Sequence, residues 1–145
     1  ETLEAKGNNI DLIVLLYANI PVRPAGVIDI AVRMMLDTGA DSVHTISGVG
    51  KFHPYWLFRK DDDNSVSKYI PNNIYRRQDL PELFSIDGAV SVLRRDIVMA
   101  AAGNDNPHAF WGTDIKGLTL APHETIDIDS MRDFLLAESI IKSRQ

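Results

Sequence analysis

The first apolar positions of the chain form an uninterrupted run and do not alternate with polar ones. Residues 11–17 read Asp-Leu-Ile-Val-Leu-Leu-Tyr, which is typical of a central strand buried on both faces of a sheet. Residues 27–38 place apolar side chains at helical spacing, and Gly39 supplies a helix stop. The apolar stripe of this helix consists of Ile28, Ala31, Val32, Met35 and Leu36. Residues 42–47 alternate and predict a second strand, so we expect a βαβ unit with a parallel pair.

The middle of the chain has a different pattern. Residues 48–86 combine short β-rich stretches with prolines and a charged tip, a pattern that predicts an arm or hairpin projecting from the main sheet. Residues 88–93 indicate another core strand, and residues 118–120 a short one. We find no internal repeat and no low-complexity segment.

The end of the chain predicts an amphipathic helix over residues 130–142. Its apolar positions are Met131, Phe134, Leu135, Ala137, Ile140 and Ile141. Ser130 and Asp133 have the spacing of a capping box, with Asp in place of the usual Glu or Gln. Residues 125–129, just before this helix, alternate as a strand does.

Composition limits the classes of function. The 145 residues suit one globular domain; 45% are hydrophobic and 24% charged. A formal net charge of -5 argues against general nucleic-acid binding, which needs a cationic surface. There is no cysteine, no apolar run of membrane-spanning length and no signal-peptide pattern in residues 1–9. We therefore expect a cytoplasmic protein with no membrane partner. Because no initiator Met is present, we also expect a piece of something longer.

Asp127 and Asp129 are the first candidate for chemistry. In an extended chain, side chains at positions i and i+2 project to the same face, so both carboxylates would lie together. Two adjacent carboxylates repel each other unless a cation lies between them. Mg²⁺ that is also held by substrate phosphates fits this arrangement. The simpler alternative, favoured by the pattern alone, is that Asp129 caps the last helix and Asp127 is a solvated strand residue.

Three arginines are candidates for binding an anion. Arg76 and Arg77 precede Gln78 and Asp79, and such a cluster can hold a carboxylate or phosphate by bidentate hydrogen bonds. The alternative for this cluster is an exposed charged turn. Arg23 follows the first buried strand, where α/β sheets bind ligands beyond the strand ends. An ordinary surface arginine is the equally weighted alternative there.

Phe110 and Trp111 could line an apolar ligand pocket, although two neighbouring aromatics are more often part of a core or its cover. The histidines lack the spacing of a metal-binding helix motif, and we assign none of them a catalytic role. The chain has no Gly-rich phosphate loop and no serine nucleophile elbow.

In this order the motifs resemble the acylneuraminate cytidylyltransferases, which make CMP-activated sialic acids and related sugar acids. The family's Arg-Arg-Gln-Asp-Leu-Pro segment stands unbroken at residues 76–81, and its Ile-Asp-Ile-Asp at residues 126–129. Asp87-Gly88-Ala89 matches the start of a family strand, with Asp in place of Asn. Residues 20–23 match the loop after its buried strand. The resemblance covers the chain from about residue 11 onward.

The resemblance implies an α/β, three-layer, Rossmann-like nucleotidyltransferase domain with a mostly parallel sheet, incomplete at the N-terminus. It makes all 145 residues one domain, and residues 48–86 become a dimerisation arm that is exchanged across a homodimer. Arg77 would bind the sugar-acid carboxylate, with Arg76 and Gln78 beside it. Further implied substrate-binding residues are Tyr17, Arg23, Phe110 and Trp111.

The implied reaction is attack by the anomeric hydroxyl of a nine-carbon sugar acid on the α-phosphate of CTP, with release of pyrophosphate. Asp127 and Asp129 would bind Mg²⁺, and Asp129 or a metal-bound water could act as the general base. The family's nucleotide-binding loop lies upstream of every matched segment, so the chain would lack part of the CTP site. Two alternatives stay open: a non-catalytic dimerisation or binding fragment, and an enzyme for a deoxyoctulosonate-type acid.

Overall fold

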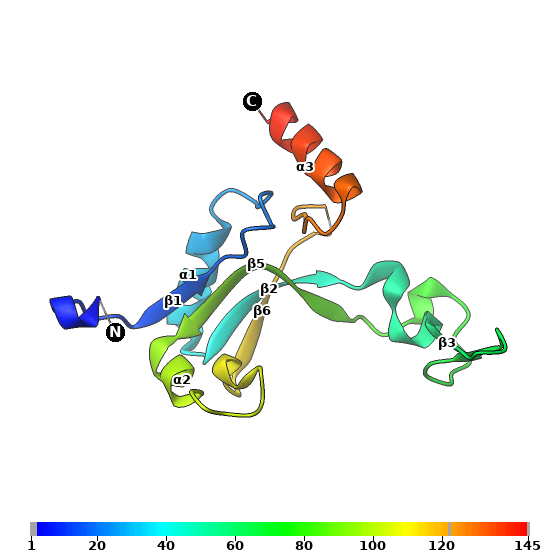
Figure 1. The fold of residues 1–145 in the computed structure, drawn as a ribbon, viewed down its shortest axis with the longest axis horizontal. Helices are drawn as coiled ribbons and strands as arrows, with labels where there is room; N and C mark the ends of the chain where they lie inside the picture. Colours follow the sequence, from blue (N-terminus) through cyan, green and yellow to red (C-terminus); the bar gives the residue numbers. More distant parts are fainter. Residues whose placement is uncertain (1–2, 122, 145) are drawn as a thin grey trace. The chain divides into compact units, whose positions relative to one another are not determined.

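The computed structural model describes residues 3–121 and 123–144. The α-helices and strands, in chain order, are β1 (Leu12–Leu15), α1 (Val27–Thr38), β2 (Ser42–Gly48), β3 (Phe58–Lys60), β4 (Val66–Lys68), β5 (Phe84–Arg94), α2 (Arg95–Ala100), β6 (Ile115–Thr119) and α3 (Met131–Ser143). The short 3-10 turns are η1 (Glu4–Lys6), η2 (Gly50–Phe52), η3 (Pro54–Trp56), η4 (Arg77–Asp79) and η5 (Ala109–Trp111). The protein is thus mixed α/β, as the sequence predicts (Figure 1).

The chain forms two compact units. One comprises Glu1–Ile46 and Ile86–Gln145 and is called the sheet unit below; the other comprises Ser47–Ser85 and is called the hairpin unit. Among the described residues, no helix is long and apolar enough to cross a membrane.

The main sheet has four strands in the order β1-β5-β2-β6. β1 pairs antiparallel with β5, and β2 pairs parallel with β6. Arg94 donates its backbone N–H to Asp41 O, while Val90 donates to Thr45 Oγ1, so β5 runs antiparallel to β2 as well. The sheet is therefore mixed. β1 and β2 thus run parallel to each other, as the βαβ unit predicts, but they do not pair, because β5 lies between them.

β1 is an edge strand, which corrects the prediction of a central strand buried on both faces. None of its residues is fully buried, and the Val14 side chain is 38% exposed. The strands that are buried in this way are β2 and β5, in which the consecutive residues 42–45 and 88–93 are buried. An apolar run shows that a segment avoids water, but not which neighbour covers it.

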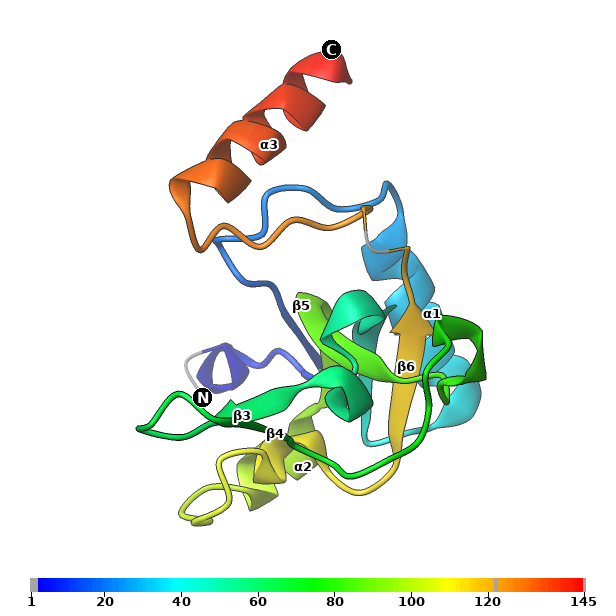
Figure 2. The ribbon, with the colours of Figure 1, turned by 90° about the vertical axis from the view of Figure 1, so that its right-hand side faces the viewer.

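α1 packs on one face of the sheet (Figures 1 and 2). Its bounds agree with the prediction, and Gly39, at φ 64°, ends it with a backbone N–H bond to Met35 O. The core consists of Ile20, Val27, Ala31, Met35, Ala40, Val43, Ala89, Val90, Val92 and Leu120. Leu36 was expected on the buried stripe but is 69% exposed.

α3 begins with the predicted capping box. Ser130 Oγ accepts from the Asp133 N–H, and the Asp133 carboxylate accepts from the Ser130 N–H. Only Ala137 of this helix is buried, in a small cluster with Val22 and Ile126. The expected strand over residues 125–129 is a single antiparallel bridge between Val22 and Ile126.

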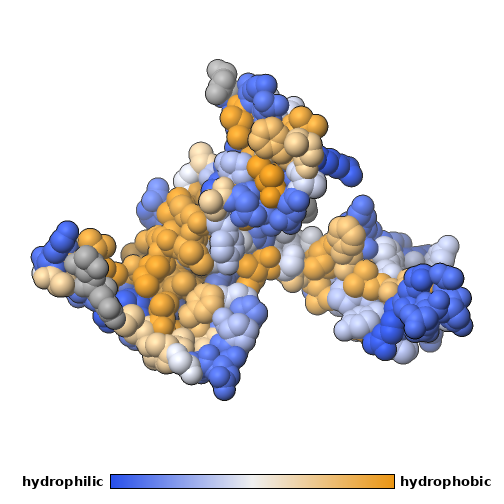
Figure 3. All heavy atoms as spheres, viewed as in Figure 1, coloured by the Kyte–Doolittle hydropathy of each residue, from blue (hydrophilic) through white to orange (hydrophobic). Residues whose placement is uncertain are grey.

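The hairpin unit consists of 3-10 turns and the antiparallel pair β3 and β4 (Figure 2). His53 is its one buried residue. His53 Nδ1 accepts from the Tyr55 N–H, and Nε2 lies 3.1 Å from Pro81 O, so Nε2 carries the proton. Apolar side chains lie at the unit's surface (Figure 3), among them Phe52, Phe58, Val66, Tyr69 and Tyr75.

Candidate functional site

Two polar segments meet beyond the carboxyl end of β1. The loop that follows β1 is joined to residues 126–129 by the Val22–Ile126 bridge and by a hydrogen bond from the Ile128 N–H to Asn19 O. Asn19 Nδ2 also donates to Asp127 Oδ1 across 2.5 Å. The structure therefore brings four predicted site residues to one region of the sheet unit: Tyr17, Arg23, Asp127 and Asp129.

Asp127 and Asp129 lie in the same short segment, and the charge of Asp129 raises the pKa of Asp127. Both are exposed, while Ile126 between the two loops is buried. Partial burial of the Asp127 carboxyl raises its pKa, the negative charges of Asp129 and Asp133 raise it further, and the Asn19 hydrogen bond opposes them. The pair thus carries like charges that a cation would relieve.

The donor set suits a hard divalent cation bound in part by other ligands. Within residues 3–121 and 123–144, no three His, Cys, Asp or Glu side chains are grouped to hold a metal ion. Two carboxylates completed by water and substrate phosphate oxygens are ligands that Mg²⁺ accepts. Asp127 and Asp129 therefore suit a hard divalent cation whose remaining ligands come from water or a bound anion.

Arg23 is a fixed, half-buried cation. Its Nε donates to Ala89 O at 2.7 Å and its Nη2 to Tyr17 O at 2.6 Å. Burial lowers its pKa, but a guanidinium stays charged in proteins. No carboxylate within the described parts of the chain forms an ion pair with it. Three N–H donors of its five are left for an anion.

Gly88 allows β5 to pass close to the side chains of Tyr17 and Ile20. Its φ is +74°, which is costly for any residue with a Cβ, and a Cβ there would lie 2.8 Å from Tyr17 Cδ2 and 3.2 Å from Ile20 Cδ1. The Tyr17 ring is thus packed against the Gly88 backbone, while 49% of the residue stays exposed. Tyr17 is held in place and still accessible to a ligand.

Phe110 and Trp111 lie elsewhere in the sheet unit. They belong to η5, which precedes β6, whereas Asp127 follows β6; Figure 1 shows η5 and the segment before α3 at opposite ends of this strand. The Trp111 ring packs between two histidines, with centroid distances of 4.9 Å to His44 and 4.2 Å to His108. The structure does not bring these aromatics to Arg23 and the aspartates.

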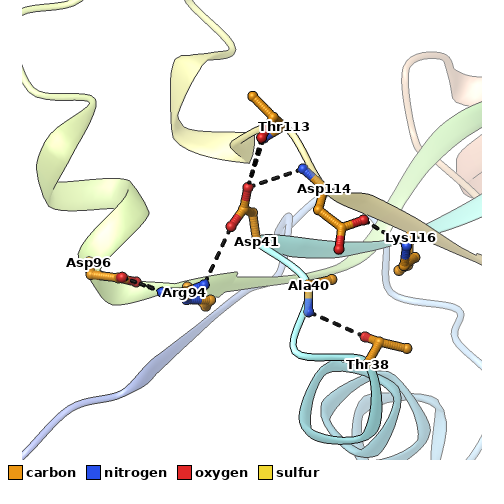
Figure 4. Close-up of polar contacts among 8 residues, drawn as sticks. All are labelled: Thr38, Ala40, Asp41, Arg94, Asp96, Thr113, Asp114 and Lys116. Atoms are coloured by element: carbon orange, nitrogen blue, oxygen red, sulfur yellow. Dashed lines mark hydrogen bonds and ion pairs between the residues drawn. The ribbon is translucent and has the colours of Figure 1, made fainter.

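A polar network anchors η5 to the start of β2 (Figure 4). Asp41 Oδ2 accepts from the N–H groups of Thr113 at 2.9 Å and Asp114 at 3.0 Å. These bonds lower the pKa of Asp41. Arg94 lies 3.4 Å from Asp41 Oδ1 and also pairs with Asp96. The network explains how η5 is positioned.

Arg76, Arg77 and Gln78 belong to the hairpin unit. Arg77 and Gln78 lie in η4, and Arg76 is the residue before it. All three are exposed. The exposed charged turn considered for this segment is what the local structure contains, and the three side chains are accessible to a ligand.

The sequence did not single out Asn19 or Thr45, and Asp87 entered only through the family resemblance, with no interaction partner predicted for it. Thr45 donates to Asp87 Oδ1 at 2.5 Å over a separation of 42 residues. No local pattern reports such a pairing. Asn19 had a usable signal, because it stands in the loop after a strand, where ligands of α/β sheets bind.

Comparison of the chain with models of known protein families and with curated proteins gives no match.

Proposed function

We propose that the protein transfers CMP from CTP to the anomeric hydroxyl of a nine-carbon sugar acid, as acylneuraminate cytidylyltransferases do. One observation carries the proposal: a half-buried arginine, with no carboxylate partner among the described residues, and a pair of like-charged aspartates lie on two loops bridged at Val22 and Ile126. An anionic substrate that brings a divalent cation is the ligand class that satisfies both groups.

Each side chain has a defined part in this proposal. Arg23 would bind a phosphate or the sugar-acid carboxylate with its remaining donors. Asp127 and Asp129 would hold Mg²⁺, which neutralises phosphate charge when it is bound. Asn19 orients the Asp127 carboxylate through its 2.5 Å hydrogen bond. Asp129 is exposed, and its carboxylate oxygen that does not bind the cation would accept the proton of the attacking hydroxyl.

The second part of the proposal is a homodimer, which the surface of the hairpin unit supports. This unit of Ser47–Ser85 contains no buried apolar residue, and its exposed apolar side chains include Phe52, Phe58, Val66, Tyr69 and Tyr75. Such a surface favours an interface. In the proposed dimer it packs against a second copy, and Arg77 contributes to the partner's site. A monomer in sedimentation at high concentration would remove this part.

We also propose a more specific fold than mixed α/β. The mixed four-stranded sheet with α1 on one face is compatible with part of a three-layer, Rossmann-like nucleotidyltransferase domain. A position beyond the carboxyl end of a strand is where α/β folds place their ligands, and the candidate site occupies such a position after β1.

The test is pyrophosphate release from CTP by the natural full-length protein, with a panel of nine-carbon sugar acids and a deoxyoctulosonate. We expect turnover with a nine-carbon acid and a loss of at least about a hundredfold in Asp129→Asn. Preference for the eight-carbon acid would select the alternative substrate. No turnover with any acid would leave a non-catalytic binding module.

A further inference from the structure

Asp87 lies in β5 beside the residues assigned to the site. One oxygen of its carboxylate is fully used: Oδ1 accepts from Thr45 Oγ1 at 2.5 Å and from the Ala89 N–H at 3.0 Å. The other oxygen, Oδ2, is buried and has no hydrogen-bond donor among residues 3–121 and 123–144. Burying an acceptor without a donor costs stability, and native structures do so rarely. The carboxylate is therefore not explained by stability alone.

The bond from Ala89 connects Asp87 to Arg23. The N–H of Ala89 donates to Asp87, and the carbonyl oxygen of Ala89 accepts from Arg23 Nε at 2.7 Å. Arg23 Nη2 in turn donates to Tyr17 O. A second route is an unbroken series of hydrogen bonds: the Val90 N–H, in the same peptide group as the Ala89 carbonyl, donates to Thr45 Oγ1 at 3.0 Å, and Thr45 Oγ1 donates to Asp87 Oδ1.

Two physical effects allow Asp87 to act on Arg23 through these hydrogen bonds. Asp87 accepts from the Ala89 N–H and from the Thr45 hydroxyl, and these two bonds fix the backbone at Ala89. Ala89 follows Gly88, whose backbone is left-handed. In addition, hydrogen bonds in series polarise one another. Thr45 donates to Asp87 and accepts from the Val90 N–H of the Ala89–Val90 peptide group, so this series makes the Ala89 carbonyl a better acceptor for the guanidinium. Asp87 therefore acts on Arg23 although the two side chains need no contact.

We propose that Asp87 is a positioning residue for Arg23 and acts through Ala89. Its carboxylate holds the Ala89 carbonyl that orients the guanidinium, so that the free donors of Arg23 face the anionic ligand. Any effect of this positioning on turnover rests on the proposed function. The positioning itself is a property of the free protein and is tested without any substrate.

The first test measures solvent exchange of the Arg23 Nε–H by NMR in the free protein. Asp87→Ala should accelerate it by about tenfold or more, because the acceptor that Nε–H uses loses its support. Asp87→Asn retains the Oδ1 acceptor and should stay within about twofold of wild type. The Arg94 Nε–H, which donates to Asp96 Oδ1 at 3.0 Å, is the internal control and should not change. An unchanged Arg23 rate in Asp87→Ala overturns the proposal, as does an equal rise at Arg94.

The second test is kinetic. Asp87→Ala should raise KM for the ligand of Arg23 by about tenfold with a smaller effect on kcat, and Asp87→Asn should restore most of the loss. In an Arg23→Ala background Asp87→Ala should have no further effect, because both act through one interaction. Additive losses would contradict the positioning role. Absence of turnover in the wild type would reject the proposed function, while the exchange rates would still decide the role of Asp87.

Discussion

Asn19 Nδ2 lies 2.5 Å from Asp127 Oδ1 and joins the loop after β1 to the segment before α3. This hydrogen bond stabilises the charged form of Asp127, while burial and the charges of Asp129 and Asp133 favour the protonated form. The ionisation of Asp127 therefore reports on the geometry of the whole candidate metal site.

Asn19→Ala should raise the pKa of Asp127, because it removes a hydrogen bond that lowers it. Asp129→Asn should lower the same pKa, because it removes a neighbouring negative charge. Carbon-detected NMR titration of the Asp127 carboxyl measures both. Shifts of the same sign in the two variants would show that the described arrangement is wrong.

The buried His44 should make stability depend on pH. Its ring nitrogens lie 2.8 Å from Ser91 Oγ and 3.0 Å from Ser42 Oγ, and burial lowers its pKa below the ordinary 6.5. The unfolded chain then binds more protons than the folded one, so stability is complete above pH 6.5 and falls as the pH drops through the folded pKa.

Denaturant unfolding between pH 7.5 and pH 5.5 measures this dependence. One proton corresponds to at most about 1.4 kcal/mol per pH unit. His44→Gln should give a shallower slope than the wild type. Equal slopes in the two proteins would mean that His44 is not the group responsible.

Gly112→Ala should destabilise the sheet unit through the Asp41 network. Gly112 has φ +77° and ψ -153°, a region that costs other residues about 1–3 kcal/mol. A Cβ there would also lie 2.3 Å from Asp41 Cβ. Gly103→Ala is the matched control, since its φ is +78° but nothing lies within 4 Å of the added carbon. The free energy of unfolding should fall further in Gly112→Ala; equal losses would count against a close contact with Asp41.

Ser130→Ala should cost about 1 kcal/mol of unfolding free energy, because it removes the N-cap of α3. Ser139→Ala, at an exposed position inside the same helix, should be neutral or slightly stabilising. Chemical denaturation followed by circular dichroism compares the two. If the loss in Ser130→Ala does not exceed that in Ser139→Ala, the capping box does not support the helix.

The sequence predicts the local structure of this protein better than it predicts which strands lie next to one another. Helix α1 and its Gly39 end follow from spacing and from a residue that tolerates positive φ, and the capping box at Ser130 follows from a three-residue motif. The position of β1 at the sheet edge does not follow, because strand order depends on pairings between distant segments. A run of apolar residues is equally compatible with either position.

The same division applies to the candidate site. Asp127 and Asp129 were found from a local i, i+2 pattern, and Arg23 from its place after a strand. Their association depends on the Val22–Ile126 bridge and on Asn19, contacts that span more than a hundred residues. The interaction of Asp87 with Thr45 is equally non-local. No pattern within one segment specifies such contacts.

The most direct test of the central claim is to identify the product by mass spectrometry. The natural full-length protein is incubated with CTP, Mg²⁺ and a nine-carbon sugar acid, beside an Asp127→Asn/Asp129→Asn double variant and a Ser139→Ala control. We predict a CMP-linked sugar acid with the wild type and with Ser139→Ala, and none above background with the double variant. Equal product from the double variant, or no CMP-linked product from the wild type with any sugar acid, would contradict the account.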